Sequence, residues 1–228
     1  MKFLSIIPAR EGSKGLKDKN IATLSNKPLI AWTIQASLKS KYISKTIVSS
    51  DSKKILDISK AFGSEVILRP STLALDNTPS EPVIKHLLNS LDEEFDFIVL
   101  LQPTSPLRDS FDIDNSIDLL IREKASSLIS VKEIDNKILK SFKIDENGYL
   151  EPISNNEYPF MPRQSLPKVY MPNGAIYIIS TSEFLKHEKL ISNRCISYIM
   201  SDEKSIDIDG QNDLEICEAI LNKWSVYE

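Results

Sequence analysis

A short segment near the N-terminus combines the residue types that bind phosphate groups. Residues 10–20 contain one Arg, three Lys and two Gly, and they directly follow the apolar run of residues 3–9. Arg and Lys make charge-assisted hydrogen bonds with phosphate oxygens, and glycine lets backbone N–H groups approach them. The segment lacks both the P-loop and the dinucleotide spacing of glycines. A solvated basic loop is the alternative, but a position just after the first predicted strand favours triphosphate binding.

Two aspartates near the C-terminus have the spacing of a metal-ligand pair. In an extended segment, residues i and i+2 face the same way, so Asp207 and Asp209 are expected to point their carboxylates to one side. Two hard oxygen ligands suit a magnesium–phosphate complex. The alternative is an exposed acidic pair ahead of a helix that starts near Asn212. Taken alone, this pair fits the alternative better, because short acidic pairs are common on surfaces.

Two further polar segments border predicted strands. Residues 101–108 read Leu-Gln-Pro-Thr-Ser-Pro-Leu-Arg, where Gln102 is placed to reach a ligand, although a proline-rich turn explains the run equally well. Residues 170–177 contain Asn173 and Tyr177, which we place at the mouth of a site, and a turn is again the alternative. The histidines, His86 and His187, fall on predicted helix faces and form no nucleophilic triad.

The elements that must position these residues alternate between strand and helix. Short loops between such elements predict a mainly parallel sheet with helices on both faces, with ligands at the carboxyl ends of the strands. A capping box at Thr78–Glu81 predicts a helix to about Leu91. The other predicted strands are 3–9, 45–50, 65–68, 95–101, 128–131, 175–179 and 197–200, and the other predicted helices start at Pro28 or span 52–62, 112–124 and 182–189, before a final amphipathic helix.

The alternation of predicted strands and helices is interrupted between about residues 135 and 174. Asp145 to Gly148 have the composition of a hairpin turn, and a stretch with Pro152, Pro159, Pro162 and Pro167 follows. We therefore divide the chain into an α/β domain of residues 1–134 and 175–228 and a β-rich excursion of residues 135–174.

The composition limits the partners and the compartment. The chain has 228 residues, 41% of them hydrophobic and 26% charged, with a formal net charge of −4. An acidic chain is a poor nucleic-acid binder, and no apolar run approaches a membrane span. The two cysteines form no paired motif, and Cys217 is expected to be a buried free thiol. We expect a cytoplasmic protein, because Arg10 and Glu11 interrupt the N-terminal apolar run too early for a signal peptide.

Together, the four motifs resemble those of the acylneuraminate cytidylyltransferases, the CMP-sialic acid synthetase family. They cover nearly the whole chain, in the family's order. The likeness is carried by Ile7-Pro8-Ala9-Arg10-Glu11-Gly12-Ser13-Lys14-Gly15 with Lys19-Asn20, by Gln102 to Arg108, by Pro172 to Tyr177, and by Ser205-Ile206-Asp207-Ile208-Asp209.

The resemblance implies a fold, a reaction and a set of roles. The fold would be a three-layer α/β/α, Rossmann-like nucleotidyltransferase, and the excursion would form a homodimer interface. The anomeric hydroxyl of a nine-carbon, sialic-acid-like sugar would attack the α-phosphorus of CTP, with Mg²⁺ as cofactor. Arg10, Lys19 and Asp209 would be catalytic, and Arg10, Gly12, Ser13, Lys19, Asn20 and Arg69 would bind the nucleotide. Asp207 and Asp209 would hold the metal, and Gln102, Lys140, Asn173, Tyr177 and a partner's Arg163 would contact the sugar.

One departure from the family pattern concerns the sugar. Sialic-acid members often carry adjacent phenylalanines before the strand that leads to the paired aspartates, where this chain has Arg194-Cys195-Ile196-Ser197. We therefore include legionaminic and pseudaminic acids as candidate substrates. The chain ends near its last predicted helix, so no added hydrolase domain is expected.

Three alternatives remain. A cytidylyltransferase for the eight-carbon acid Kdo would carry a second Arg and a Leu-Pro step where this chain has residues 14–17. A non-catalytic sugar-nucleotide-binding protein would not need intact Arg10, Lys19, Asp207 and Asp209. A surface interaction module would not need the four motifs.

Overall fold

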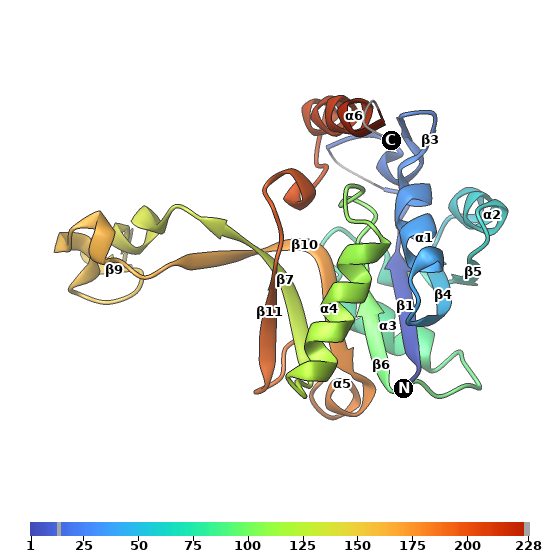
Figure 1. Cartoon of the computed structure of the whole chain (residues 1–228), viewed down its shortest axis with the longest axis horizontal. Helices are drawn as coiled ribbons and strands as arrows, with labels where there is room; N and C mark the ends of the chain where they lie inside the picture. The colour runs from blue at the N-terminus through green and yellow to red at the C-terminus, as the bar shows by residue number, and fades with distance from the viewer. Residues whose placement is uncertain (13–14, 226–228) are drawn as a thin grey trace.

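A seven-stranded sheet forms the centre of the molecule (Figure 1). The computed structural model describes residues 1–12 and 15–225. Along the sheet the order is β11-β7-β10-β6-β1-β4-β5. The strands are β1 (Phe3–Pro8), β4 (Ile43–Ser50), β5 (Glu65–Leu68), β6 (Phe97–Leu100), β7 (Ser127–Ile134), β10 (Val169–Ser180) and β11 (Cys195–Ile199).

The sheet is mainly parallel, as predicted, with one antiparallel strand. Strand β10 runs antiparallel to both of its neighbours, β6 and β7, while all other pairs are parallel. A parallel return would need a crossover, usually a helix. The chain instead leaves β7 and comes back along it as β10, so the antiparallel direction follows from the excursion between these two strands.

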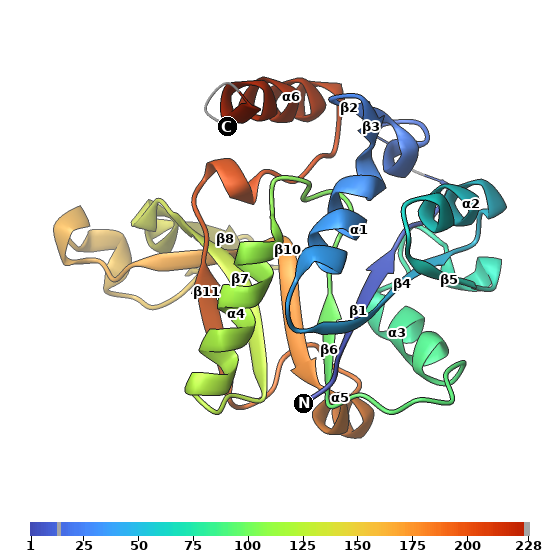
Figure 2. The same ribbon diagram turned by 45° about the vertical axis from the view of Figure 1, so that its right-hand side comes forward.

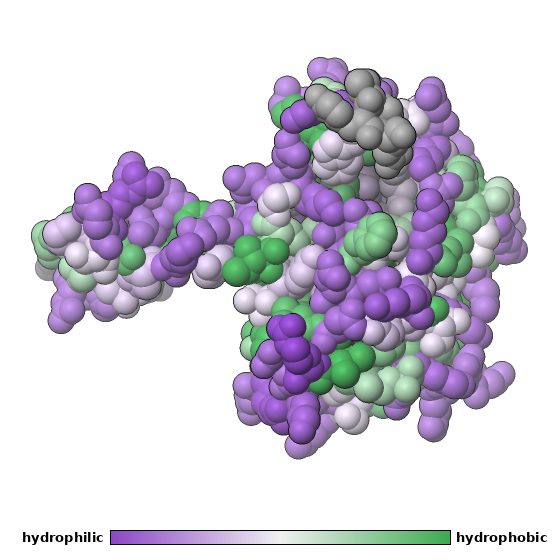
Figure 3. All heavy atoms as spheres, viewed as in Figure 1, coloured by the Kyte–Doolittle hydropathy of each residue, from purple (hydrophilic) through white to green (hydrophobic). Residues whose placement is uncertain are grey.

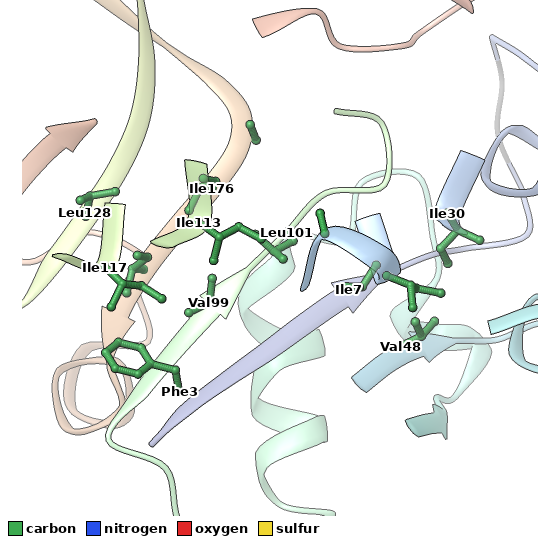
Figure 4. Close-up of a cluster of buried hydrophobic side chains, with 14 of the residues drawn as sticks. Phe3, Ile7, Ile30, Val48, Val99, Leu101, Ile113, Ile117, Leu128 and Ile176 are labelled. Atoms are coloured by element: carbon green, nitrogen blue, oxygen red, sulfur yellow. The ribbon is translucent and has the colours of Figure 1, made fainter. Parts of the chain in front are cut away.

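Helices cover both faces of the sheet (Figures 1 and 2). Helices α1 (Leu29–Lys39), α2 (Lys53–Ala61) and α4 (Ser110–Arg122) share one buried apolar cluster with the sheet, part of which Figure 4 shows. Helices α3 (Ser80–Leu88) and α5 (Thr181–His187) share a second cluster with the opposite face. Alternate residues of β1 divide between the two clusters, Ile7 in the first and Ile6 in the second. The predicted α/β/α layers are confirmed.

Helix α6 (Gln211–Ser225) lies across one end of the domain (Figure 1). Its buried Leu214 and Cys217 belong to a third apolar cluster. Strands β2 (Thr23–Leu24) and β3 (Lys27–Pro28) form a small hairpin, which contributes Leu24 to this cluster. The start of α1 contributes Leu29, and the loops that carry two of the motifs contribute Leu107 and Ile208. The helix therefore fastens these loops to one another. The predicted burial of the Cys217 thiol is confirmed.

An arm projects from the domain between β7 and β10 (Figures 1 and 3). These two strands continue together to its base, where Ile134 pairs with Val169. The arm contains the antiparallel pair β8 (Phe142–Ile144) and β9 (Leu150–Pro152), so the predicted hairpin is confirmed. The arm also contains the short 3-10 turns Asn136–Lys140, Tyr158–Phe160 and Arg163–Ser165.

The capping box predicted at Thr78 is wrong. Pro79 is extended, with ψ of 169°, so α3 begins at Ser80, and no side chain within residues 1–12 and 15–225 caps it. Glu81 then stands one position too early in the helix to complete the box. A complete capping box instead starts α4, where Asp109 and Asp112 each accept a hydrogen bond from the other's backbone amide.

None of the helices within residues 1–12 and 15–225 combines the length and the apolar character that a membrane span requires.

Candidate active site

The cationic loop and the second aspartate of the pair, Asp209, meet at one cavity of about 490 Å³, whereas Asp207 lines a neighbouring cavity. The first cavity lies at the carboxyl ends of β1, β5 and β6, where ligands of such sheets bind. Arg10 and Asp209, from opposite ends of the chain, both line it. The lining includes Arg10, Gly15, Lys19, Asn20, Arg69, Asp76, Gln102, Thr104 and Asp209. We call it the main cavity.

The loop packs directly against the second aspartate. A Cβ atom added to Gly15 would lie 2.1 Å from the Asp209 carbonyl oxygen, so only glycine fits there. Lys19 Nζ donates hydrogen bonds to the Ile208 carbonyl oxygen at 2.7 Å and to Asp209 Oδ1 at 3.1 Å. The loop and the aspartate segment therefore form one continuous wall of the main cavity.

Two polar contacts set the position of Arg10. The buried Asn20 donates from Nδ2 to the Arg10 carbonyl oxygen at 2.8 Å, which fixes the backbone there. The guanidinium of Arg10 forms an ion pair with Asp76, on the loop that leads to α3. Asn20 thus supports the loop in addition to bordering the main cavity.

Arg69 is a buried cation on the same cavity wall. Its side chain is 3% exposed, and its nearest carboxylate contact is Asp51 at 3.9 Å. Burial lowers the pKa of Arg69, the Asp51 carboxylate raises it and the nearby Arg10 lowers it. Among the residues that the structure describes, Nε has no hydrogen-bond partner. A buried, under-satisfied guanidinium beside a second one is a setting for an anionic ligand.

The aspartate segment alternates as an extended chain should. Ile208 is fully buried, whereas its neighbours Asp207 and Asp209 are exposed on the other side. The Ile208 amide donates to the Thr104 carbonyl oxygen at 2.8 Å, which ties this segment to the loop after β6. The predicted common orientation of the two carboxylates agrees with this alternation.

The environment of Asp207 favours a positive partner. Although Asp207 keeps an exposed surface, desolvation of its carboxyl by the surrounding protein raises its pKa above the ordinary value, and the neighbouring Asp209 and Asp213 carboxylates raise it further. A hydrogen bond with Thr104 and the charge of Lys19 oppose that rise. No group of three or more His, Cys, Asp or Glu side chains in the described part of the chain is arranged to hold a metal ion. The pair fits Mg²⁺ that binds through one or two carboxylates plus substrate phosphates.

A second cavity of about 590 Å³ adjoins the main one, and Gln102 lines both. Tyr177 and Asp207 also line the second cavity. Burial raises the pKa of the Tyr177 phenol, and the Asp207 charge adds to this rise, so the phenol stays protonated and able to donate. The remaining lining includes Lys132, Met171, Pro172, Asp213 and Ile216.

Several predicted residues lie elsewhere or serve another purpose. Lys140 and Arg163 are on the arm, and neither lines the main or the second cavity of its own chain, so any sugar contact from them would have to cross between subunits. Gly12 is exposed and does not line the main cavity, and Ser13 lies outside the described residues. Asn173 borders the second cavity.

Asn173 is buried, and its side-chain amide is engaged by protein groups. It accepts a hydrogen bond from Ser130 Oγ at 2.6 Å and donates one to Ser205 Oγ at 2.9 Å. The amide thereby ties β7 and β10 to the turn that precedes the aspartates. The structure assigns Asn173 this supporting contact, and its predicted contact with the sugar stays a prediction.

Sequence reasoning missed three charged residues around the site, namely Asp76, Arg108 and Lys204. Arg108 is fully buried, and it donates to Thr33 Oγ1 at 2.8 Å and to the Gln102 carbonyl oxygen at 3.4 Å. Burial lowers its pKa to about 10. Its place at the end of the Gln102–Arg108 motif was the available signal, but a buried role cannot be read from the motif alone.

Because the motifs predict that the main cavity binds CTP, we expect Asp76→Asn to strengthen that binding. The substitution removes a carboxylate that competes with phosphate oxygens for Arg10. A partly exposed ion pair contributes about 0.2–1 kcal/mol, so the KM for CTP should fall about 1.4- to 5-fold with kcat unchanged. Steady-state kinetics with CTP as the varied substrate measures this. The control is Asp57→Asn on α2, an exposed site outside the main cavity. An unchanged or higher KM in Asp76→Asn contradicts the competition.

Comparison with known proteins agrees with this geometry. A profile of the family described as cytidylyltransferase matches residues 4–194. The chain belongs to the cytidylyltransferase family. This cytidylyltransferase is 37% identical over 223 residues to an N-acylneuraminate cytidylyltransferase of Escherichia coli O18:K1:H7, covering 97% of this chain and 52% of that protein. The chain therefore spans about half the length of that relative.

Other relatives match along nearly their whole length. A CMP-N,N'-diacetyllegionaminic acid synthase of Legionella pneumophila is 34% identical, with 97% of each chain covered. A pseudaminic acid cytidylyltransferase of Campylobacter jejuni is 27% identical, with 96% of each covered. Among solved structures, a CMP:2-keto-3-deoxy-manno-octonic acid synthetase complexed with CTP matches with a TM-score of 0.74 at 15% identity, over 98% of this chain and 99% of that one. This last likeness shows the fold alone.

Proposed function

We propose that this cytidylyltransferase transfers CMP from CTP to the anomeric hydroxyl of a nine-carbon, sialic-acid-like sugar acid and releases pyrophosphate. One observation carries the proposal: three cations and Asp209, from distant parts of the chain, border a single cavity, and Gln102 connects it to a second cavity that Asp207 lines. The first cavity suits a triphosphate and the second a polar sugar. The sequence relatives are named for activity on sialic, legionaminic and pseudaminic acids, and these names support the same substrate class.

The proposed reaction requires positioning and charge neutralisation. The anomeric oxygen forms a bond to the α-phosphorus of CTP, the bond from that phosphorus to the bridging oxygen breaks, and pyrophosphate leaves while the hydroxyl proton is lost. Arg10, Lys19 and Arg69 hold the phosphates and offset the charge that develops on their oxygens. Gln102 and Tyr177 orient the sugar so that its hydroxyl faces the phosphorus.

Mg²⁺ is the proposed cofactor, with Asp207 and Asp209 as its protein ligands. When bound there with CTP, the ion would neutralise charge on the phosphate oxygens. Lys19 keeps Asp209 in place through its hydrogen bond at 3.1 Å.

A substrate panel tests this function. Purified protein is incubated with CTP, Mg²⁺ and one of N-acetylneuraminic, legionaminic, pseudaminic or Kdo acid, and released pyrophosphate is measured. We expect release with at least one nine-carbon acid and not with Kdo. Release with Kdo alone would contradict the proposed nine-carbon substrate class and indicate an eight-carbon acid as the substrate. Absence of release with every acid would overturn the enzymatic function.

We also propose a homodimer formed through the arm. Its hairpin exposes apolar side chains, with Ile144 at 72%, Tyr149 at 72% and Leu150 at 66% exposure, which is typical of a surface that a partner covers. Light scattering should give twice the 25.8 kDa mass of one chain. The double variant Ile144→Lys/Leu150→Lys should be monomeric, whereas Phe111→Lys, at an equally exposed site on α4, should not change the mass. A monomeric wild type contradicts the dimer.

A further inference from the structure

The segment that carries the two aspartates is held by a lysine that lies outside both cavities. Lys204 Nζ donates hydrogen bonds to Asp109 Oδ2 and to Asp112 Oδ2, each at 2.7 Å. It belongs to the 3-10 turn Glu203–Ser205, three residues before Asp207. Lys204 lines neither cavity, so it does not contact a ligand bound there.

The acceptors of Lys204 are rigidly placed. Asp109 and Asp112 form the capping box of α4, in which each carboxylate also accepts a backbone amide at 3.0 Å. The Asp112 side chain is 8% exposed, and Asp112 also accepts a hydrogen bond from the Tyr198 hydroxyl of β11 at 3.3 Å. Lys204 therefore binds two carboxylates that other hydrogen bonds already hold in place at the start of α4.

This contact joins the two segments that flank the site. Helix α4 begins two residues after the Gln102–Arg108 loop, and Lys204 sits just ahead of Asp207 and Asp209. The same segments touch a second time where the Ile208 amide donates to the Thr104 carbonyl oxygen at 2.8 Å. Two attachment points on either side of Asp207 remove most of the freedom of that short stretch to slide or rotate.

The charge of Lys204 persists in this setting. Burial lowers the pKa of Lys204, but the hydrogen bonds and charges of Asp109 and Asp112 outweigh it, so the pKa ends above its ordinary value. Its side chain is only 26% exposed. A charge-assisted contact that is largely shielded from solvent is stronger and less sensitive to salt than an exposed ion pair.

We infer that Lys204 is a positioning residue, which sets Asp207 and Asp209 at the correct distance from the CTP phosphates by fastening their segment to the start of α4. The inference rests on the proposed function, in which these aspartates hold the metal. Removing a group that is hydrogen-bonded directly to a metal ligand typically changes metal affinity 10- to 100-fold. Lys204 acts on the aspartates through the backbone of their segment, so we expect an effect at the lower end of this range.

Mn²⁺ binding in the presence of CTP tests this role without requiring turnover. Proton relaxation enhancement by Mn²⁺ is titrated for wild type, Lys204→Met, Lys204→Arg and the control Lys223→Met. Lys223 contacts Glu203 of the same turn at 3.7 Å, but both side chains are more than half exposed, at 63% and 51%. We expect Lys204→Met to bind Mn²⁺·CTP about 10-fold more weakly, Lys204→Arg to recover most of the loss, and Lys223→Met to remain within about twofold of wild type.

The outcomes separate the inference from the function beneath it. If Lys204→Met binds Mn²⁺·CTP as wild type does, the positioning role is overturned while the proposed function stands. If wild type neither binds Mn²⁺·CTP nor releases pyrophosphate, the proposed function itself fails. Thermal unfolding is followed in parallel. Should Lys204→Met not fold, Lys204→Gln, which keeps a hydrogen-bond donor without the charge, decides the question by the same titration.

Discussion

Replacing Asp209 by alanine should reduce the release of pyrophosphate from CTP about 1,000-fold while leaving the fold intact, because the lost carboxylate is one of the two proposed ligands of the Mg²⁺ that would offset the charge developing on the phosphates. Its side chain is 83% exposed, so no core packing depends on it. Its hydrogen bond from Lys19 Nζ would be lost, but Lys19 keeps the Ile208 carbonyl oxygen at 2.7 Å as an acceptor. The expected defect is therefore one of chemistry and metal binding.

The matched control for Asp209→Ala is Asp202→Ala. Asp202 is another exposed aspartate of the same segment, and it lines neither cavity. Pyrophosphate release at saturating CTP and sugar acid is measured for both variants, with thermal unfolding to establish that each is folded. Asp202→Ala should turn over like wild type. Turnover by Asp209→Ala within about threefold of wild type would remove Asp209 from the metal site, since loss of such a group costs far more.

The sequence pattern predicted those elements that depend on local periodicity. Strand β5 was expected at residues 65–68 and has those bounds. Strand β10 was expected only from residue 175 but begins at Val169, because Pro172 and the Asn-Gly step read as a turn. In the structure Pro172 pairs with Val131, and Gly174 takes φ of +79° inside an irregular stretch of the strand. A break in one strand, supported by its neighbour, has the same local composition as a turn.

The candidate site was predictable at the level of its backbone segments, and its side-chain contacts were not. The motifs predicted that Arg10, Lys19 and Asp209 lie together, because parallel strands present their carboxyl ends on one edge, and all three line the main cavity. The partners that restrain them, such as Asp76 for Arg10, are 66 residues away in sequence and belong to no motif. Contacts of this kind depend on how loops fold over the sheet edge, which neither propensity nor periodicity specifies.

The arm is a second case in which a local feature could be predicted from the sequence and its position in the fold could not. Its hairpin turn was predicted from Asp145 to Gly148, and Gly148 adopts the positive φ of +86° that such a turn requires. Where the arm points depends instead on how far β7 and β10 stay paired beyond the sheet, from Val131 to Ile134. That pairing is non-local, so the position of Lys140 and Arg163 relative to the cavities was beyond the reach of the sequence.

Gly15→Ala should lower kcat/KM for CTP about 100-fold, because a displacement of about 1 Å at a reacting centre has an effect of that size. The added methyl would sit 2.1 Å from the Asp209 carbonyl oxygen, far inside contact distance. That oxygen cannot yield easily, since the Asp209 amide donates to Asp213 Oδ2 at 3.0 Å and Lys19 binds the adjoining carbonyl at 2.7 Å. The loop that carries Lys19 must therefore move away from the aspartate.

Gly12→Ala is the control that separates this contact from a general need for glycine in the loop. A Cβ atom at Gly12 would meet no atom of the residues that the structure describes within 4 Å, so this variant should retain activity within about twofold of wild type. If glycine served mainly to bring backbone amides close to phosphates, both variants would lose activity to a similar degree. If instead activity depends on the contact between the loop and Asp209, only Gly15→Ala should lose activity. Thermal unfolding establishes that both variants are folded. Equal kcat/KM values for the two folded variants would then show that the contact between the loop and Asp209 is not required for CTP use.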